Sequence, residues 1–184
     1  VIPEIDLPGH ARALVHAMPS IFINPLDHSN YISVQGYDND VIPICLYNQK
    51  SEQAKALTEK MNHIIRDISN LFSGQTTVYA ENEVSVGGDE VSQDAWSNDS
   101  SCQGYLTALD RSLTFFNDLQ ASNPTIKLSG WQQFVQTDQG NIGNNALPAN
   151  KTGHTWVWDP SHPGIAHAKI LAAHNYPTVL AYSD

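Results

Sequence analysis

Two adjacent carboxyl side chains are the strongest candidates for acid–base chemistry in this 184-residue sequence. Asp89 and Glu90 follow Gly87 and Gly88, directly after an apolar stretch with the composition of a buried strand. Two like charges this close in a partly desolvated cleft raise the pKa of one carboxyl group, and a carboxyl group that is protonated near neutral pH can serve as a general acid. The competing interpretation is a solvated surface turn, in which these residues have no chemical role.

The adjacency of the two acids also limits the mechanism that they could share. An ordinary retaining glycosidase holds two carboxyl groups about 5–5.5 Å apart on either side of the bond that it breaks. Successive side chains of a strand point to opposite faces, so we expect Asp89 and Glu90 to fit that arrangement poorly. The sequence favours a division of roles, in which one acid protonates a leaving group and its neighbour orients another part of the substrate.

The elements that would position these acids follow from hydrophobic periodicity. From Ser51 to about Phe72, apolar residues recur at steps of three and four, which is typical of an amphipathic helix with Ser51 as its N-cap and Gly74 as its stop. Residues 19–49 are polar and have no period, which predicts a long functional loop. The predicted strands are residues 1–7, 77–86, 126–129, 155–158 and 178–181, and the predicted helices are residues 51–72, 105–120 and 163–173.

The alternation of strands and helices predicts an α/β fold with a parallel sheet and crossover helices. Polar and aromatic residues follow the ends of predicted strands, which is where TIM (β/α)8 barrels keep their active sites. A complete barrel has eight strand–helix units, whereas five strands are predicted here and the chain begins without Met. We therefore expect residues 1–184 to be part of a catalytic barrel domain, roughly its strands 3 to 7, with the rest of the barrel and any accessory domains outside the chain. The residues at the predicted strand ends are His10, Asp89, Glu90, Trp131, Trp156 and Trp158.

Two longer motifs carry a family resemblance. Residues 1–13, Val-Ile-Pro-Glu-Ile-Asp-Leu-Pro-Gly-His-Ala-Arg-Ala, resemble the third-strand signature of glycoside hydrolase family 20, the β-N-acetylhexosaminidases. Residues 86–91, Val-Gly-Gly-Asp-Glu-Val, resemble the catalytic motif at the end of that family's fourth strand, and one long loop and one helix separate the two motifs as in the family. The resemblance covers essentially the whole chain. Shorter similar segments, the first two of them most like the bacterial chitobiase branch, are residues 31–35, 43–46, 130–131 and 155–158.

The resemblance implies the release of terminal non-reducing β-linked N-acetylglucosamine or N-acetylgalactosamine from chitobiose, chitooligosaccharides or glycans. It also implies substrate-assisted retention, in which the 2-acetamido oxygen of the substrate is the nucleophile. Glu90 matches the general acid, which later acts as base toward water, and Asp89 matches the residue that orients the acetamido group. No organic cofactor or metal is implied, and the histidines show no metal-ligand spacing. The alternative is a non-catalytic carbohydrate-binding protein that retains an amino-sugar pocket.

Five further residues are predicted from this resemblance to contact or surround the sugar. Trp131 and Trp158 match tryptophans around the acetamido methyl group and the sugar ring, where aromatic faces pack against apolar C–H groups and exclude water. Trp156 is the weaker sugar-binding candidate of its pair, with core packing as the competing interpretation. His10 matches a histidine that lines the family's site, and Asp6 is expected to be a polar group of the barrel interior.

Two places depart from the family pattern. Ser85 stands where family members often carry His or Asn, and a hydroxyl group cannot replace either of them as a partner of the acid. Tyr182 and Asp184 spell the family's seventh-strand Tyr-x-Asp pair, but aligning residues 179–181 with that strand places the pair beyond Asp184. We therefore predict that Tyr182 and Asp184 match by coincidence.

Charge and hydropathy exclude several classes of partner. Nine basic residues against 19 acidic residues give a formal net charge of −10, which repels phosphate backbones and anionic lipids. No apolar run approaches the ~20 residues of a membrane-spanning helix. We therefore expect an oligosaccharide partner, with no nucleic-acid binding and no membrane insertion.

The two cysteines, Cys45 and Cys102, leave two interpretations open. Neither lies in a CxxC or zinc-ligand pattern, so they are either two unpaired thiols or one disulfide formed in an oxidising compartment. Both follow predicted strands in irregular segments, so they could approach each other. A charged fraction of only 15%, with Asn, Gln and Ser carrying the polarity, favours a periplasmic or secreted protein, and the chitobiase-like segments favour a bacterial source.

Overall fold

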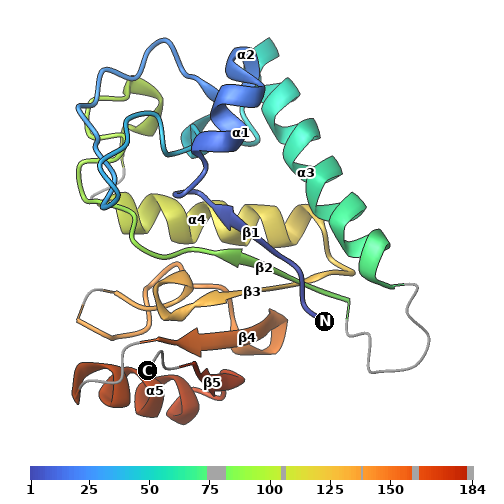
Figure 1. Cartoon of the computed structure of the whole chain (residues 1–184), viewed down its shortest axis with the longest axis vertical. Helices are drawn as coiled ribbons and strands as arrows, with labels where there is room; N and C mark the ends of the chain where they lie inside the picture. The colour runs from blue at the N-terminus through green and yellow to red at the C-terminus, as the bar shows by residue number, and fades with distance from the viewer. Residues whose placement is uncertain (74–81, 105–106, 138, 159–161, 182–184) are drawn as a thin grey trace.

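A computed structural model describes residues 1–73, 82–104, 107–137, 139–158 and 162–181 (Figure 1). Within these residues, five parallel strands form one sheet whose spatial order is their order in the chain. Sequential parallel pairing of this kind requires a crossover on one face between each strand and the next, as in a (β/α) barrel. The strands are β1 (Glu4–Leu7), β2 (Glu83–Gly87), β3 (Lys127–Trp131), β4 (Thr152–Val157) and β5 (Thr178–Leu180).

Helices connect most of the strands. The crossover from β1 to β2 contains α1 (Arg12–Ala17), α2 (Pro19–Phe22) and the long α3 (Glu52–Ser73), whereas α4 (Ala108–Ser122) links β2 to β3 and α5 (His162–Ala173) links β4 to β5. None of the helices in the described part of the chain combines the length and apolarity needed to cross a bilayer. The described parts of the connections also contain the short 3₁₀ helices η1 (Ile44–Leu46), η2 (Ser100–Cys102), η3 (Gln132–Phe134) and η4 (Ala149–Lys151).

The two longest helices have the caps and apolar faces that the sequence favours. Ser51 Oγ accepts a hydrogen bond from the backbone N–H of Ala54 at 3.1 Å, so it caps α3 as predicted. Thr107 Oγ1 caps α4 in the same way, with the N–H of Asp110 at 3.1 Å. Their buried positions recur at three- and four-residue steps, and they include Ala54, Leu57, Met61, Ile65, Leu113, Phe116 and Leu119.

The sheet has one apolar face and one polar face. Val84 and Val86 of β2 are fully buried on the helix side, where they join the main hydrophobic core. The alternate residue Ser85 points to the other face, where its Oγ contacts Glu4 Oε2 at 2.5 Å. The polar side chains therefore gather on the face that becomes the inside of a barrel.

Several predicted boundaries differ from the structure. The predicted 19–49 loop contains α2 and η1, and α1 precedes it; these helices are too short for a hydrophobic period to reveal them. Strand β2 begins at Glu83, and residues 77–81 of the predicted strand lie outside the described residues. The described part of the predicted 105–120 helix begins at Ala108. Strand β4 starts three residues early, at Thr152, and ends before Trp158.

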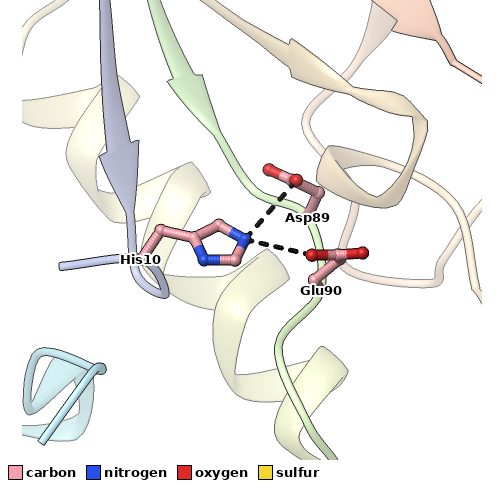
Figure 2. A group of neighbouring side chains, drawn as sticks. All are labelled: His10, Asp89 and Glu90. Carbon is pink, nitrogen blue, oxygen red and sulfur yellow. Dashed lines mark ion pairs between the residues drawn. The ribbon is translucent and has the colours of Figure 1, made fainter. Parts of the chain in front are cut away.

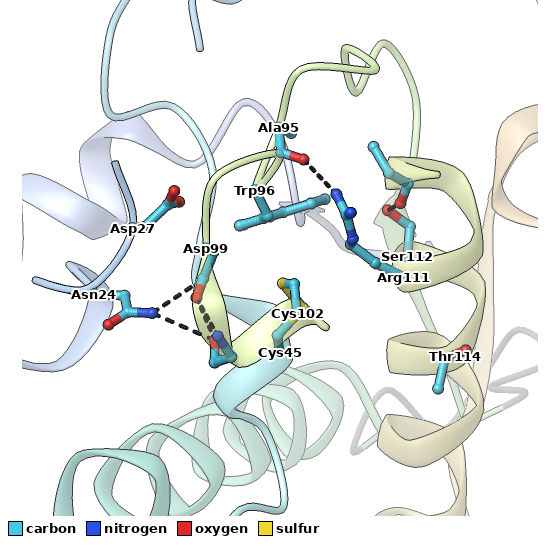
Figure 3. Close-up of a disulfide and its surroundings, with 12 residues drawn as sticks. Asn24, Asp27, Cys45, Ala95, Trp96, Asp99, Cys102, Arg111, Ser112 and Thr114 are labelled. Carbon is cyan, nitrogen blue, oxygen red and sulfur yellow. Dashed lines mark hydrogen bonds between the residues drawn. A yellow bond between two sulfur atoms is a disulfide. The ribbon is translucent and has the colours of Figure 1, made fainter. Parts of the chain in front are cut away.

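A disulfide joins Cys45 in η1 to Cys102 in η2, with their Cα atoms 5.2 Å apart (Figure 3). Of the two alternatives that the sequence left open, the structure forms the paired one. Hydrogen bonds link the same two loops nearby, from Trp96 Nε1 to the Ile42 carbonyl at 2.9 Å and from Asn24 Nδ2 to Asp99 Oδ2 at 2.9 Å. The loops that follow β1 and β2 are thus tied together beyond the carboxyl ends of the strands.

We predict that removing this disulfide destabilises the protein substantially. The bond spans 57 positions of sequence, and closing a loop of that size in the unfolded chain corresponds to about 4 kcal/mol. The double variant Cys45→Ser/Cys102→Ser should lose free energy of unfolding of that order in urea titrations. Mass spectrometry after alkylation should detect no reactive thiol before reduction and two after it, and two alkylated thiols in native protein would refute the pairing.

Candidate active site

The turn after β2 carries the two acids in a backbone conformation that needs glycine. Gly87 and Gly88 have φ values of 64° and 88°, in the left-handed region that glycine enters without steric cost. A Cβ atom on Gly87 would also lie 2.5 Å from Asp6 Oδ1, and one on Gly88 would lie 3.2 Å from Phe134 Cα. A larger residue at either position would therefore strain the turn.

His10 faces both acids from the end of the neighbouring strand β1 (Figure 2). Its Nε2 atom lies 3.6 Å from Asp89 Oδ2 and 3.5 Å from Glu90 Oε2. The expectation that the two acids point to opposite faces is therefore wrong. Both lie beyond β2, and the left-handed φ of 54° at Glu90 turns the chain so that strand alternation no longer applies. Because both acids project from one turn, they still do not straddle a bond from opposite sides.

Asp40 and Gln133 complete the immediate surroundings, and sequence reasoning missed both. Asp40 Oδ2 lies 3.8 Å from His10 Nδ1, and the Asp40 side chain is only 4% exposed. The backbone N–H of Glu90 donates to Gln133 Oε1 at 3.1 Å. These partners lie 30 and 43 residues away in loops without periodicity, and no motif marks them.

Burial raises the pKa of Asp89, and the nearby Glu90 and Glu4 carboxylates raise it further, against the opposing effect of His10. The raised pKa predicted for one of the paired acids therefore falls on Asp89. Burial, Glu4 and Asp89 also raise the pKa of Asp6. The Asp89 side chain is 18% exposed and that of Glu90 is 34% exposed. Glu90 is thus the more accessible of the two acids to a substrate oxygen.

Two of the three predicted pocket tryptophans pack against each other. Trp131, the last residue of β3, pairs in register with Trp156 of β4, and their ring centroids are 6.3 Å apart at 60°. Trp158 is 41% exposed just after β4. When the Gln132 amide is oriented to satisfy both neighbours, it accepts from Trp158 Nε1 and donates to the Trp156 carbonyl, each at 3.1 Å. The η3 turn that holds Gln132 also supplies Gln133 to Glu90, so the tryptophans and the acids are connected.

The family follows from comparison with known proteins. The model for "Glycosyl hydrolase family 20, catalytic domain" matches residues 1–184. The chain belongs to glycosyl hydrolase family 20. It is therefore a family-20 hydrolase chain, and the resemblance inferred from the sequence is confirmed.

Individual relatives agree with this assignment. The chain is 26% identical over 147 residues to a β-hexosaminidase of Vibrio furnissii, covering 76% of this chain and 22% of that protein. A family-20 exo-β-N-acetylglucosaminidase of Vibrio harveyi, crystallised with N-acetylglucosamine, superposes with a TM-score of 0.72 at 24% identity, over 97% of this chain and 25% of that one. An inactive mutant of the same enzyme superposes with a TM-score of 0.70 at 21% identity. The chain thus spans about a quarter of these relatives, and its parallel sheet is part of a TIM barrel.

Ser85, which departs from the family-20 pattern, does not contact either acid through its side chain among the hydrogen bonds of the described residues. Besides its contact with Glu4, its Oγ accepts from the backbone N–H of Gly87 at 3.4 Å. The imidazole beside the acids instead comes from His10 on the adjacent strand. Tyr182 and Asp184, which we predicted to match the family by coincidence, lie outside the described residues.

We predict that Asp89→Asn stabilises the fold at neutral pH. Because burial raises the folded-state pKa of Asp89 above 3.8, its contribution to stability is fully present below pH 3.8 and is lost as pH rises through that raised pKa. Asparagine stays neutral and removes this loss. Calorimetry should show a higher Tm for the variant at pH 7 and a shrinking difference toward pH 4. Asp38→Asn is a control of opposite sign, since Arg12 lowers the pKa of Asp38; an Asp89→Asn difference that does not change with pH would contradict the prediction.

A metal ion is the remaining chemical possibility at this cluster. One atom from each of His10, Asp89 and Glu90 lies within 4.8 Å of the others, so these groups could hold a divalent cation. The predicted chemistry needs none, because a side chain donates the proton and the substrate supplies the nucleophile. We expect dialysis against a chelator to leave turnover unchanged, and a loss that added divalent cation restores would contradict this expectation.

Proposed function

We propose that this chain is the acid-bearing part of an exo-acting β-N-acetylhexosaminidase. Its substrates would be chitobiose, chitooligosaccharides or glycans that end in non-reducing β-linked N-acetylglucosamine or N-acetylgalactosamine. The observation that carries the proposal is the placement of Asp89 and Glu90 side by side on one turn, facing His10, in a family-20 chain. Two carboxyl groups on the same turn fit a reaction in which only one of them acts on the glycosidic oxygen.

The proposed reaction has two steps. In the first, Glu90 donates a proton to the glycosidic oxygen while the carbonyl oxygen of the 2-acetamido group attacks C1, so that the C1–O bond to the leaving group breaks and a cyclic oxazolinium forms. In the second, Glu90 takes a proton from a water molecule that attacks C1 and opens the ring. The two inversions give net retention of configuration. No nucleophile from the protein is required.

Asp89 has a different task in this scheme. Its partly buried carboxylate accepts a hydrogen bond from the N–H of the acetamido group, which turns the carbonyl oxygen toward C1, and its negative charge offsets the positive charge of the oxazolinium. A carboxylate placed where positive charge develops stabilises the transition state more than the ground state. The proposed sugar site would be lined by Trp131, Trp156 and Trp158. Their rings would exclude water that competes with the acetamido oxygen.

A direct assay separates this enzyme from its alternative, a carbohydrate-binding protein without turnover. The full-length protein is given 4-nitrophenyl N-acetyl-β-glucosaminide, and chromophore release is measured beside calorimetric binding of N-acetylglucosamine. We expect release with saturable kinetics. Binding of the sugar without chromophore release would overturn the enzymatic proposal and favour the alternative.

We also propose that the parent protein is bacterial, works in the periplasm or after secretion, and contributes to chitin degradation. The disulfide between Cys45 and Cys102 supports an oxidising compartment. Fractionation of the native source, followed by detection of the protein, tests the location. Recovery in the cytoplasmic fraction with both thiols reduced would refute it.

A further inference from the structure

A second polar pair lies on the inner face of the sheet, away from the two acids. The Glu83 side chain, at the start of β2, is completely buried, and both of its carboxyl oxygens lie 3.0 Å from His154 Nδ1 on β4. Oε1 also accepts from the backbone N–H of His154 at 2.7 Å. With Glu83 as the acceptor of both ring contacts, the proton of the imidazole is assigned to Nδ1. Glu83 thus reaches across the intervening strand β3 and fixes the ring of His154.

The backbone of β4 is shaped for this contact. Between the pairs Leu128–Thr152 and Gly130–Thr155, β4 has one residue more than β3, so the ladder shifts there. Glu83 supplies the acceptor for a backbone N–H at this irregularity. Gly153 allows the approach, since a Cβ atom there would lie 2.5 Å from Glu83 Cδ. The contact with the Glu83 carboxyl group is therefore part of the backbone structure of β4 at this point.

From His154 the contacts lead to the tryptophans. The imidazole stacks on Trp156, with ring centroids 6.1 Å apart and planes 29° from parallel. Trp156 in turn packs against Trp131. These contacts form a continuous row across the inner face of three strands, made up of Glu83, His154, Trp156 and Trp131.

We propose that Glu83 is a positioning residue for the sugar site. Glu83 fixes the ring of His154, which stacks on Trp156. Through this contact it holds Trp156 and Trp131 in the orientation that receives the amino sugar. The proposal rests on the proposed function only in naming the ligand. Tryptophan side chains that contact the sugar in both the ground state and the transition state bind the two states equally. A change in the orientation of these side chains therefore raises KM more than it lowers kcat.

The test variant is Glu83→Gln in the full-length protein, which keeps the side-chain shape and an acceptor for the N–H of His154. Its amide nitrogen takes the place of one carboxyl oxygen and directs an N–H donor at the Nδ1 proton, so the imidazole loses one of its two acceptors and the contact that fixes the ring is weakened. We expect KM for the chromogenic N-acetylglucosaminide to rise about tenfold with a smaller change in kcat. A merely structural role would lower the fraction of folded enzyme, and hence the apparent kcat, without moving KM.

A double-mutant cycle decides whether the effect passes through Trp156. In a Trp156→Leu background, Glu83→Gln should cause no further rise in KM and no further change in near-UV circular dichroism. Gln120→Ala is the matched control, because Gln120 Oε1 likewise accepts a buried strand N–H, that of Leu128 at 3.0 Å, on the opposite face of the sheet. This variant should lose stability and keep its KM.

Two results would overturn the proposal: an unchanged KM in Glu83→Gln, or effects of Glu83→Gln and Trp156→Leu that multiply in the double variant. A wild-type protein without glycosidase activity would defeat the proposed function only. In that case the double-mutant cycle measured by near-UV circular dichroism still tests the proposal, because the tryptophan signal reports the coupling between Glu83 and Trp156 without any enzymatic activity.

Discussion

Replacing Glu90 by Gln should lower kcat/KM by about 10²–10⁴-fold, the range that a general acid contributes. The amide has the same shape as the acid but no proton to donate at neutral pH. The loss should depend on the leaving group, since 4-nitrophenolate departs with little protonation whereas a sugar hydroxyl group does not. We therefore expect a loss near the lower end of that range on the nitrophenyl glycoside and a loss near its upper end on chitobiose, measured as kcat/KM for each.

The matched control is Glu59→Gln, which removes one acidic charge from an exposed position on α3. It should leave kcat/KM unchanged for both substrates. Equal losses on both leaving groups in Glu90→Gln would show that Glu90 does not protonate the glycosidic oxygen. Wild-type rates in that variant would remove Glu90 from the mechanism altogether.

Replacing Asp89 by Asn should lower kcat by about 10²–10³-fold, as the loss of one preorganised electrostatic partner does. Asparagine can still accept a hydrogen bond from the acetamido N–H, so KM should change little. It carries no negative charge, however, and cannot offset the oxazolinium cation. Steady-state kinetics on the N-acetylglucosaminide measure both constants.

The affinity of Asp89→Asn for a stable thiazoline analogue of the cyclic intermediate should fall by the same factor as its kcat, because such analogues report transition-state interactions. Asp94→Asn is the control, since it makes the same charge change at an exposed position of the same segment. An Asp89→Asn variant that binds the analogue as tightly as the wild type would contradict the role given to Asp89. Measuring the Tm of the same variant, which we expect to rise, separates a loss of activity from a loss of folding.

The sequence allowed the candidate pair of acids and the helices that flank it to be located. The Gly87–Glu90 motif is contiguous, and α3 has an apolar period long enough to read, so both depend only on local sequence. The pairing of Cys45 with Cys102 needed the structure, because the spacing of two cysteines does not show whether their loops meet.

Contacts between distant loops and strands could not be predicted. Gln133 approaches Glu90 because β2 and β3 are neighbours in the sheet. Asp40 approaches His10 because the loop after β1 folds back, with the backbone N–H of Ala11 donating to the Asp40 carbonyl at 3.0 Å. The opposite-face prediction for Asp89 and Glu90 failed for a related reason. Their strand ends at Gly87, and the turn that follows has a geometry that strand alternation does not describe.

One comparison of substrates tests whether the acetamido group of the substrate is the nucleophile. The full-length protein is assayed on two 4-nitrophenyl β-glycosides that differ only at C2, one bearing the acetamido group and the other a hydroxyl group. We predict ready hydrolysis of the N-acetylglucosaminide and no detectable hydrolysis of the glucoside, because the glucoside lacks the nucleophile. Comparable kcat/KM values for the two substrates would contradict it.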